Sequence, residues 1–348
     1  MNPPWKIVRT DAELQLPRVD AALRAVGARL VLLPDGVAKA KLTHEVSDAD
    51  LLLMCYTPIT AGVIQAATRL KAIVKYGVGI DAIDIPAARE RGIPVVNIPR
   101  YAEETVAEGA FFLMLALARR MKPLQRAMQE HGWAWPEPAW LGHDLAGKTL
   151  GLIGLGHIGR SVARMAAGFR MRVIAHDPHW PVPSVLPVLA GGLEVERMDH
   201  LDDLLAASDV VSIHCVLNDS THHLIGAAEL ARMKPSAMLI NVSRGEIVDE
   251  AALLAALQAG RIAGAALDVY GREPLQRHGH PLSPLFAMDK VLLWPHLTFY
   301  TVEAMQRLED ETLARCFEAL HGQALSVSSR DPRLRAQQRG VRFVDGCD

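Results

Sequence analysis

Three loops in the second half of the chain carry a guanidinium, a carboxylate and an imidazole, and each loop follows a run of apolar residues. The side chains belong to Arg244, Glu273 and His296. A guanidinium binds carboxylate and carbonyl oxygens in a planar fork, and a histidine near neutral pH can donate a proton and recover it. A carboxylate paired with that imidazole favours its charged form and fixes its orientation. These groups fit the reduction of a 2-keto acid, in which an acid group is anchored and a carbonyl oxygen is protonated.

Upstream of these loops, a glycine-rich turn joins a predicted strand to a predicted helix. Gly154, Gly156 and Gly159 form the pattern GxGxxG in this context. The glycines permit a tight turn and let backbone amides approach a pyrophosphate at the positive end of the helix. Asp177 closes the next predicted strand 18 positions after Gly159, close to the roughly 20 at which an acidic residue binds the ribose. Its carboxylate repels a 2′-phosphate, so the sequence predicts NAD rather than NADP.

Each candidate catalytic residue has an ordinary explanation when it is taken alone. Arg244 could be a surface arginine, Glu273 could be a loop acid, and His296 is one of 14 histidines. Ligands of open α/β sheets bind outside the carboxyl ends of the strands, so Arg244, Asp268 and His296 are expected in one crevice with Glu273 close behind. This joint placement downstream of a nucleotide-binding pattern favours catalysis.

Short β-branched or Leu-rich runs alternate with Ala-rich helical patterns along the chain, which predicts βαβ units and parallel sheets of the α/β class. Two doubly wound sheets fit better than one, because so many strands would make a single sheet unusually wide. The predicted strands are Lys6–Arg9, Arg29–Leu33, Leu51–Met54, Ala72–Lys75, Thr149–Ile153, Arg172–Ala175, Val210–His214, Met238–Asn241, Gly264–Asp268 and Val291–Leu293. The predicted helices include Ala12–Val26, Ala61–Ala67, Ile158–Ala167, Ala251–Ala259 and Val302–Leu320.

A further long helix is expected from about Tyr101, at the boundary between the two sheets. Its centre, residues 111–115, is apolar on all sides, so we expect burial between domains or in a subunit interface. A central helix of one domain is the alternative, but a helix this apolar favours a dimer.

The composition excludes several partners and locations. The chain has 348 residues, enough for about two domains. Its 37 Lys and Arg balance 39 Asp and Glu, without the clustered basic face that nucleic-acid binding needs. No apolar run approaches the ~20 residues of a membrane span. There is no signal-peptide pattern, and the four cysteines are scattered. We therefore expect a soluble, cytoplasmic protein with no bound metal.

The sequence resembles the D-isomer-specific 2-hydroxyacid dehydrogenases over about residues 70–307. The motifs that carry the resemblance are residues 76–81, 104–108, 154–159, 241–245, 268–274 and 295–296. The resemblance implies that Arg244 binds substrate, that Glu273 partners the imidazole and that His296 is the general acid/base. Val78 and Gly79 would offer backbone amides to the substrate carboxylate. The implied cofactor contacts are Gly154, Gly156, His157, Ile158, Gly159, Asp177, Val216, Ser243, Arg244 and Asp268, the last of which would reach the nicotinamide amide.

The resemblance also implies discontinuous domains and a homodimer. A Rossmann-type NAD domain over residues 101–297 would be inserted into a flavodoxin-like substrate domain made of residues 1–100 and 298–330. A cleft between them would close on the ligand and exclude water. Residues 331–348 are polar and Arg-rich, and we expect a solvated or loosely docked tail there.

Two local features favour different substrates within the family. The Trp-rich residues 132–142 resemble the loop of glyoxylate and hydroxypyruvate reductases, where a tryptophan can reach the neighbouring subunit's active site, although such aromatics could equally pack a dimer interface. Residues 296–301, which include Phe299, resemble the stretch after the catalytic histidine in D-lactate dehydrogenases, but that branch usually has Ala at the position of Thr298. Both features indicate a small, unphosphorylated 2-keto acid. Glyoxylate or hydroxypyruvate ranks first and pyruvate second.

A non-enzymatic alternative comes from relatives in the same family. The C-terminal-binding-protein corepressors bind NAD and retain the catalytic trio, but they act mainly as peptide-binding dimers. They carry tryptophan at the position of Phe299, so the phenylalanine here favours an enzyme. Turnover with a 2-keto acid separates the two interpretations.

Overall fold

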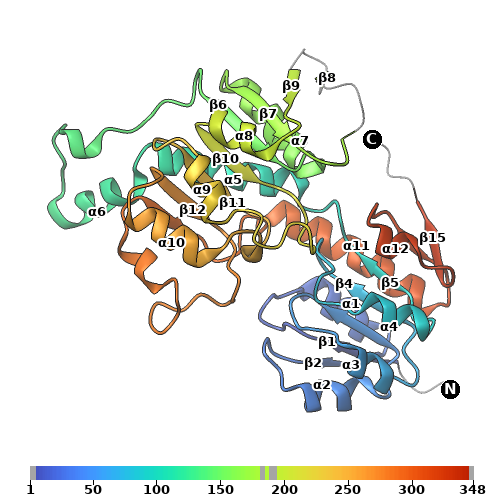
Figure 1. The fold of residues 1–348 in the computed structure, drawn as a ribbon. Coiled ribbons are helices and arrows are strands. Elements are labelled where there is room, and N and C mark those ends of the chain that lie inside the picture. The colour runs from blue at the N-terminus through green and yellow to red at the C-terminus, as the bar shows by residue number, and fades with distance from the viewer. Residues whose placement is uncertain (1–4, 181–184, 188–193, 345–348) are drawn as a thin grey trace. The chain divides into compact units, whose positions relative to one another are not determined.

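The computed structural model describes residues 5–180, 185–187 and 194–344, and the chain forms two compact units (Figure 1). One unit comprises residues 1–102 and 301–348, and the other comprises residues 103–300. The second unit is therefore an insertion in the first. Each unit is built on its own largely parallel sheet, which confirms the predicted α/β class with two parallel-sheet domains.

The first unit contains a five-stranded parallel sheet in the order β2-β1-β3-β4-β5. This order is that of flavodoxin-like folds. Four of the strands are wholly buried, as expected of a parallel sheet covered on both faces. Three of them contain at most one polar residue, whereas β1 has Ile7 and Val8 between Lys6 and Arg9. The strands are β1 (Lys6–Arg9), β2 (Arg29–Leu32), β3 (Leu51–Met54), β4 (Ala72–Lys75) and β5 (Val95–Asn97). The helices between them are α1 (Pro17–Ala25), α2 (Lys39–Val46), α3 (Ala61–Ala66) and α4 (Ile85–Glu90).

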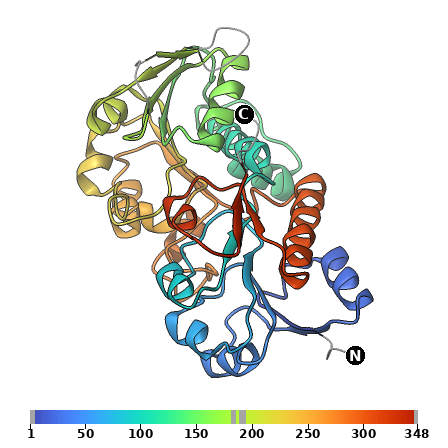
Figure 2. The same cartoon turned by 90° about the vertical axis from the view of Figure 1, so that its right-hand side faces the viewer.

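The chain returns to the first unit through α11 (Val302–Leu320), the long red helix of Figure 2, which packs against α1, β3 and β4. Beyond it, β14 (Leu325–Val327) pairs in parallel with β15 (Val341–Phe343), and α12 (Pro332–Arg335) lies between them in the sequence. The Thr301 hydroxyl caps α11 by accepting a hydrogen bond from Ala304 N.

The prediction of a loose C-terminal tail is wrong for residues 331–344. Leu334 of α12 is fully buried, and the Gln337 side chain bonds both backbone groups of Val95 on the edge strand β5, at 2.7 Å and 2.9 Å. The physical reason is that an edge strand leaves backbone groups without partners, and a polar composition does not reveal that this segment supplies them. Residues 345–348 of the predicted tail lie outside the described residues.

The second unit contains an eight-stranded sheet in the order β13-β12-β11-β10-β6-β7-β9-β8. Its first strand, β6, lies in the middle, as in a Rossmann fold, and the chain reverses direction along the sheet between β6 and β10. All neighbouring strands are parallel except β8 and β9. The strands are β6 (Thr149–Ile153), β7 (Arg172–His176), β8 (Val185–Pro187), β9 (Glu194–Arg197), β10 (Val210–Ile213), β11 (Met238–Asn241), β12 (Gly264–Leu267) and β13 (Val291–Leu293).

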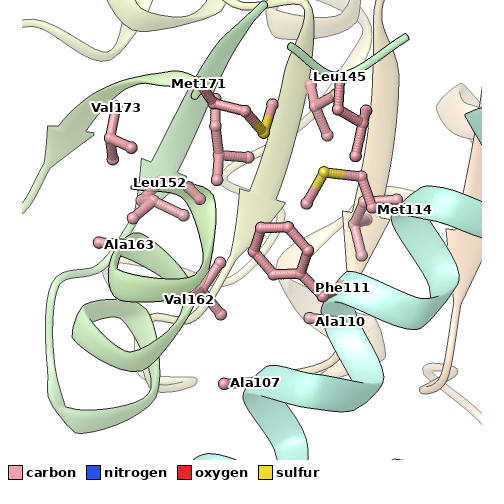
Figure 3. Close-up of a cluster of buried hydrophobic side chains, with 14 of the residues drawn as sticks. Ala107, Ala110, Phe111, Met114, Leu145, Leu152, Val162, Ala163, Met171 and Val173 are labelled. Carbon is pink, nitrogen blue, oxygen red and sulfur yellow. The ribbon is translucent and has the colours of Figure 1, made fainter. Parts of the chain in front are cut away.

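Helices cover both faces of this sheet. Residues of α5 and α7 form one apolar cluster with one set of strand residues, and residues of α8, α9 and α10 form a second cluster with the alternate set. Figure 3 shows Phe111 and Met114 of α5 among Leu152, Val162 and Met171 in the first cluster. The helices are α5 (Glu103–Ala118), α6 (Met121–His131), α7 (His157–Gly168), α8 (Leu201–Ala207), α9 (Ala227–Arg232) and α10 (Glu250–Gln258), with 3-10 turns η1 (Pro138–Trp140), η2 (Gly245–Ile247) and η3 (Ser283–Ala287).

Among the described residues, no helix combines the length and the apolar character that crossing a membrane requires.

Candidate active site

An imidazole–carboxylate pair lies beyond the carboxyl ends of β12 and β13. His296 Nδ1 donates a hydrogen bond to Glu273 Oε2 at 2.7 Å, and about a quarter to a third of each side chain is exposed. With Nδ1 bound to a carboxylate, Nε2 is the ring nitrogen through which His296 can exchange a proton with a ligand. The ring of Phe299 meets the imidazole edge-on, with ring centres 6.3 Å apart.

The other carboxylate oxygen holds Glu273 in place. Glu273 Oε1 accepts a hydrogen bond from Tyr270 N at 2.9 Å. Burial acts to raise the pKa of Glu273, but the hydrogen bond and charge of His296, the Tyr270 amide and the charge of Arg244 outweigh it, so the pKa lies below its ordinary value. Glu273 is therefore a carboxylate at neutral pH.

Asp268 fixes the loop that carries His296. The Asp268 carboxylate is buried and accepts hydrogen bonds from Leu297 N at 2.8 Å and Thr298 N at 3.1 Å, and from the Thr298 hydroxyl at 2.5 Å. Its backbone carbonyl accepts from His296 N at 2.8 Å. His296 itself has φ +56°, a conformation that is uncommon outside glycine and that neighbouring structure must hold. These hydrogen bonds to Asp268 stabilise that conformation.

Arg244 follows β11 and lies on a turn pressed against the Glu273 loop. A Cβ added to Gly245 would come within 1.9 Å of the carbonyl carbon of Tyr270. The Arg244 guanidinium donates to Ser243 O at 2.7 Å, and its charge acts on Glu273. The structure thus brings Arg244, Glu273 and His296 together at one edge of the sheet.

The glycine-rich turn has the geometry that a dinucleotide needs. Gly154 has φ +94°, and a Cβ there would lie 2.6 Å from Cys215 N. A Cβ on Gly159 would lie 2.3 Å from Gly154 O, whereas Gly156, the N-cap of α7, faces open space. Gly154 thus makes the tight turn, Gly159 packs the helix on the strand, and Gly156 leaves room for backbone approach.

The first turn of α7 and Asp177 complete this part of the site. His157 and Ile158 begin the helix, where backbone N–H groups have no intrahelical acceptor. Asp177, directly after β7, accepts from Leu155 N of the glycine turn at 2.8 Å and from His179 N at 2.9 Å. The carboxylate is therefore held beside the turn, as a ribose-binding acid would be.

Hydrogen bonds join the loop after β10 to the loop after β11, beside the glycine-rich turn of residues 154–159. The Ser243 hydroxyl donates to Cys215 O at 2.5 Å, and the exposed Val216 accepts from the Thr221 hydroxyl at 2.6 Å. Burial, followed by the charge of Asp177, raises the pKa of the Cys215 thiol to about 12. Burial lowers the pKa of His214 to about 3, so its ring is neutral.

The two predicted substrate-binding residues of the first unit lie on a turn after β4. Val78 is exposed and Gly79 is half-buried, and among the described residues neither amide N–H has a hydrogen-bond acceptor. The turn itself is fixed, because Asn97 Nδ2 donates to Val78 O at 2.6 Å and Ile98 N donates to Gly77 O at 3.0 Å. Two amide donors on a fixed turn can bind a carboxylate.

Three positioning residues of this site were not identified from the sequence. Tyr270 and Thr298 act through the amide and hydroxyl that hold Glu273 and Asp268, and Gly245 acts through lack of a side chain. A Gly directly after Arg244 was a possible signal, because glycine often marks a close backbone approach. The described residues contain no group of three or more His, Cys, Asp or Glu arranged to hold a metal ion.

The site fits a nicotinamide dinucleotide next to an acid-binding and proton-donating group. The glycine turn and Asp177 suit the pyrophosphate and ribose, and the Arg244–Glu273–His296 group lies at the ends of neighbouring strands of the same sheet. Such a site can transfer a hydride and a proton to a carbonyl group, or remove them from a hydroxyl group.

Comparisons with known proteins agree with this chemistry. Residues 111–298 match the model of the D-isomer specific 2-hydroxyacid dehydrogenase NAD binding domain. A glyoxylate reductase from Korarchaeum cryptofilum is 41% identical over 276 residues, which are 78% of this chain and 80% of that protein. A D-3-phosphoglycerate dehydrogenase from Methanocaldococcus jannaschii is 36% identical over 306 residues, which are 88% of this chain but 56% of that protein.

A solved structure shows the same relationship. The D-lactate dehydrogenase from Aquifex aeolicus, in complex with NAD and lactic acid, superposes with a TM-score of 0.80 at 29% identity, covering 91% of this chain and 96% of that one. The predicted resemblance is confirmed. The chain belongs to the D-isomer-specific 2-hydroxyacid dehydrogenase family, whose members are NAD-dependent oxidoreductases acting on the CH–OH group of 2-hydroxy acids.

Proposed function

We propose that the chain reduces a small, unphosphorylated 2-keto acid to the D-2-hydroxy acid, with glyoxylate or hydroxypyruvate as the first candidates and pyruvate as the second. The observation that carries the proposal is the 2.7 Å bond between His296 Nδ1 and Glu273 Oε2, beside Arg244 at the strand ends. This bond orients the ring so that a proton can be exchanged with a ligand through Nε2.

In the proposed reaction, His296 is the general acid. Nε2–H donates its proton to the carbonyl oxygen as that oxygen becomes a hydroxyl, and in the reverse direction Nε2 takes the proton back. Glu273 keeps the ring oriented through Nδ1 and stabilises the imidazolium. Bound NADH supplies the hydride that the carbonyl carbon receives.

Two donor groups would hold the substrate. The guanidinium of Arg244 can bind the carboxylate and the carbonyl oxygen together, and the amides of Val78 and Gly79 have no acceptor among the described residues. In this proposal residues 103–300 form the NAD domain, and residues 1–102 and 301–344 form the substrate domain.

The ranking of substrates follows from the aromatic residues and the relatives. The first-ranked candidates are supported by the exposed Trp133 and Trp135 and by the similarity to a glyoxylate reductase. Pyruvate is supported by Phe299, which borders the imidazole, and by the similarity to a D-lactate dehydrogenase. The Thr298 hydroxyl donates a hydrogen bond to the Asp268 carboxylate, so this side chain helps to fix the loop that carries His296.

We propose a homodimer formed through α5. Phe112 of α5 is 41% exposed and packs edge-on against the partly exposed Trp294, with ring centres 5.3 Å apart, and Met121 lies nearby with 42% exposed. Together they line one hollow in the second unit. Exposed aromatic residues that gather on one face suit a protein interface. Light scattering should show a dimer that Phe112→Asp disrupts, while Val302→Asp, which changes an apolar residue of α11 that is 70% exposed, leaves it intact.

A steady-state screen tests the proposed activity. Glyoxylate, hydroxypyruvate, pyruvate and 3-phosphohydroxypyruvate are each supplied with NADH and with NADPH, and cofactor oxidation is followed. We expect turnover of at least one unphosphorylated acid with NADH. Turnover of the phosphorylated acid alone would contradict the proposed substrate class, and tight NADH binding without any turnover would favour the corepressor-like alternative.

A further inference from the structure

A buried lysine lies at the end of β4, directly before the turn that carries the amides of Val78 and Gly79. Lys75 is 5% exposed. Its Nζ donates a hydrogen bond to Cys55 O, lies 3.2 Å from Cys55 Sγ and lies 5.4 Å from the centre of the Tyr56 ring. These neighbours give the ammonium its hydrogen-bond acceptors and a π face, but none of them carries a full negative charge.

No carboxylate forms an ion pair with Lys75 among the described residues. Asp11, the acid on the adjoining loop, accepts hydrogen bonds from Thr10 and from residues 55–57 instead. The Cys55 thiol donates to Tyr76 O at 3.4 Å, and burial raises its pKa, so it is not a thiolate. A buried cation without a counter-charge is costly, and each such group in a native protein needs an explanation.

The position of the ammonium supplies that explanation. A Cβ added to Gly77 would lie 3.1 Å from Lys75 Nζ, so the charge lies beside Gly77, directly before Val78 and Gly79. The amides of Val78 and Gly79 belong to this same turn and are available to a ligand. A buried positive charge beside a turn that carries two such donors makes the turn a stronger anion site, because low-dielectric surroundings strengthen the field of the charge.

We propose that Lys75 is a positioning residue for the substrate carboxylate: its ammonium makes the 77–79 turn electropositive, and the bound carboxylate is its counter-charge. Lys75 does not touch the substrate and acts through the turn. The inference rests on the proposed function, since it assumes that the carboxylate of a 2-keto acid binds at Val78 and Gly79.

The experiment measures how tightly the protein holds an unreactive 2-keto acid analogue. Calorimetry gives the dissociation constant of oxamate for the NADH-saturated full chain, and glyoxylate, hydroxypyruvate and pyruvate turnover is recorded alongside. The variants are Lys75→Met, which removes charge and hydrogen bonds, Lys75→Gln, which keeps an amide donor for Cys55 O, and Lys75→Arg, which keeps the charge. Lys41→Met, at an exposed lysine of α2, is the control for net charge.

We expect Lys75→Met and Lys75→Gln to weaken oxamate binding by about tenfold or more, the size expected of a unit charge acting at an effective dielectric constant of ~20. Lys75→Arg should stay much closer to the unchanged protein, Lys41→Met should bind oxamate normally, and NADH affinity should not change. If Lys75→Met does not fold, Lys75→Gln decides. If Lys75→Gln binds oxamate as tightly as the unchanged protein does, the lysine acts only through its hydrogen bond to Cys55 O. This result would overturn the proposal.

The outcome also separates this inference from the proposed function. If the unchanged protein binds oxamate and turns over a 2-keto acid, and both neutral variants bind oxamate equally well, the role of Lys75 is overturned while the proposed function stands. If the unchanged protein neither binds oxamate nor turns over any 2-keto acid of the panel, the proposed function is overturned, and the role of Lys75 with it.

Discussion

Gly245 and Tyr270 approach each other so closely that a methyl group on Gly245 would lie 1.9 Å from the Tyr270 carbonyl carbon. This contact joins the turn that carries Arg244 to the loop that carries Glu273. We predict that Gly245→Ala lowers kcat/KM by about a hundredfold, since a misplacement of ~1 Å can have an effect of that size. The control is Gly168→Ala in α7, where an added Cβ meets nothing within 4 Å. Equal activity of the two variants would mean that this contact does not set the catalytic geometry.

Asp177 should set the choice of cofactor. We predict that Asp177→Ala weakens NADH binding and narrows the preference for NADH over NADPH, because the carboxylate both accepts hydrogen bonds from the ribose and repels a 2′-phosphate. Fluorescence titration with each cofactor measures both effects. Asp199→Ala is a matched control, because Asp199 lies beyond the next strand, β9, with 76% of its side chain exposed. Unchanged selectivity would show that another group binds the ribose.

His214 should make the second unit sensitive to mild acid. Burial lowers its pKa to about 3 in the folded chain from 6.5, so between these values the unfolded chain takes up a proton that the folded chain does not. Stability is therefore full above pH 6.5 and falls as the pH decreases toward 3, with a slope of up to about 1.4 kcal/mol per pH unit. Urea unfolding between pH 7 and pH 4.5 measures this slope.

In that experiment, His214→Gln should flatten the slope, and His131→Gln, at a histidine with 71% of its side chain exposed, should leave it as it was. An equal slope in all three proteins would assign the acid sensitivity to other groups.

The strands were predicted more accurately than the segments that pack at their edges. The predicted bounds of β1, β3, β4, β6, β11 and β13 agree with the structure. Of these, β3, β4, β6 and β11 are buried along their whole length and their runs are mainly apolar, which is the signal of a strand covered on both faces. The short strands β5, β8, β9, β14 and β15 were not predicted. Most of these runs lack a clear apolar or alternating pattern, and β5 is held in part by a distant segment, through Gln337 and Val95.

The start of one helix and the partners of one carboxylate also depend on contacts that the sequence does not reveal. The predicted helix Ala12–Val26 begins only at Pro17, because Asp11 has φ +54° and binds the loop after β3. For Asp268, the sequence placed the residue at a strand end, and only the structure reveals that Leu297 and Thr298 bind its carboxylate. Which partner a carboxylate takes depends on loops that meet in three dimensions.

The most direct test of the account is the rate of hydride transfer in a single turnover of the His296→Asn variant, measured by stopped flow with enzyme in excess over NADH and with the best 2-keto acid. His131→Asn is the control. We predict that His296→Asn lowers this rate by about 10²–10⁴-fold, the usual contribution of a general acid, while the dissociation constant of NADH stays the same. A rate close to that of the unchanged protein would contradict the proposal that His296, paired with Glu273, donates the proton to the carbonyl oxygen.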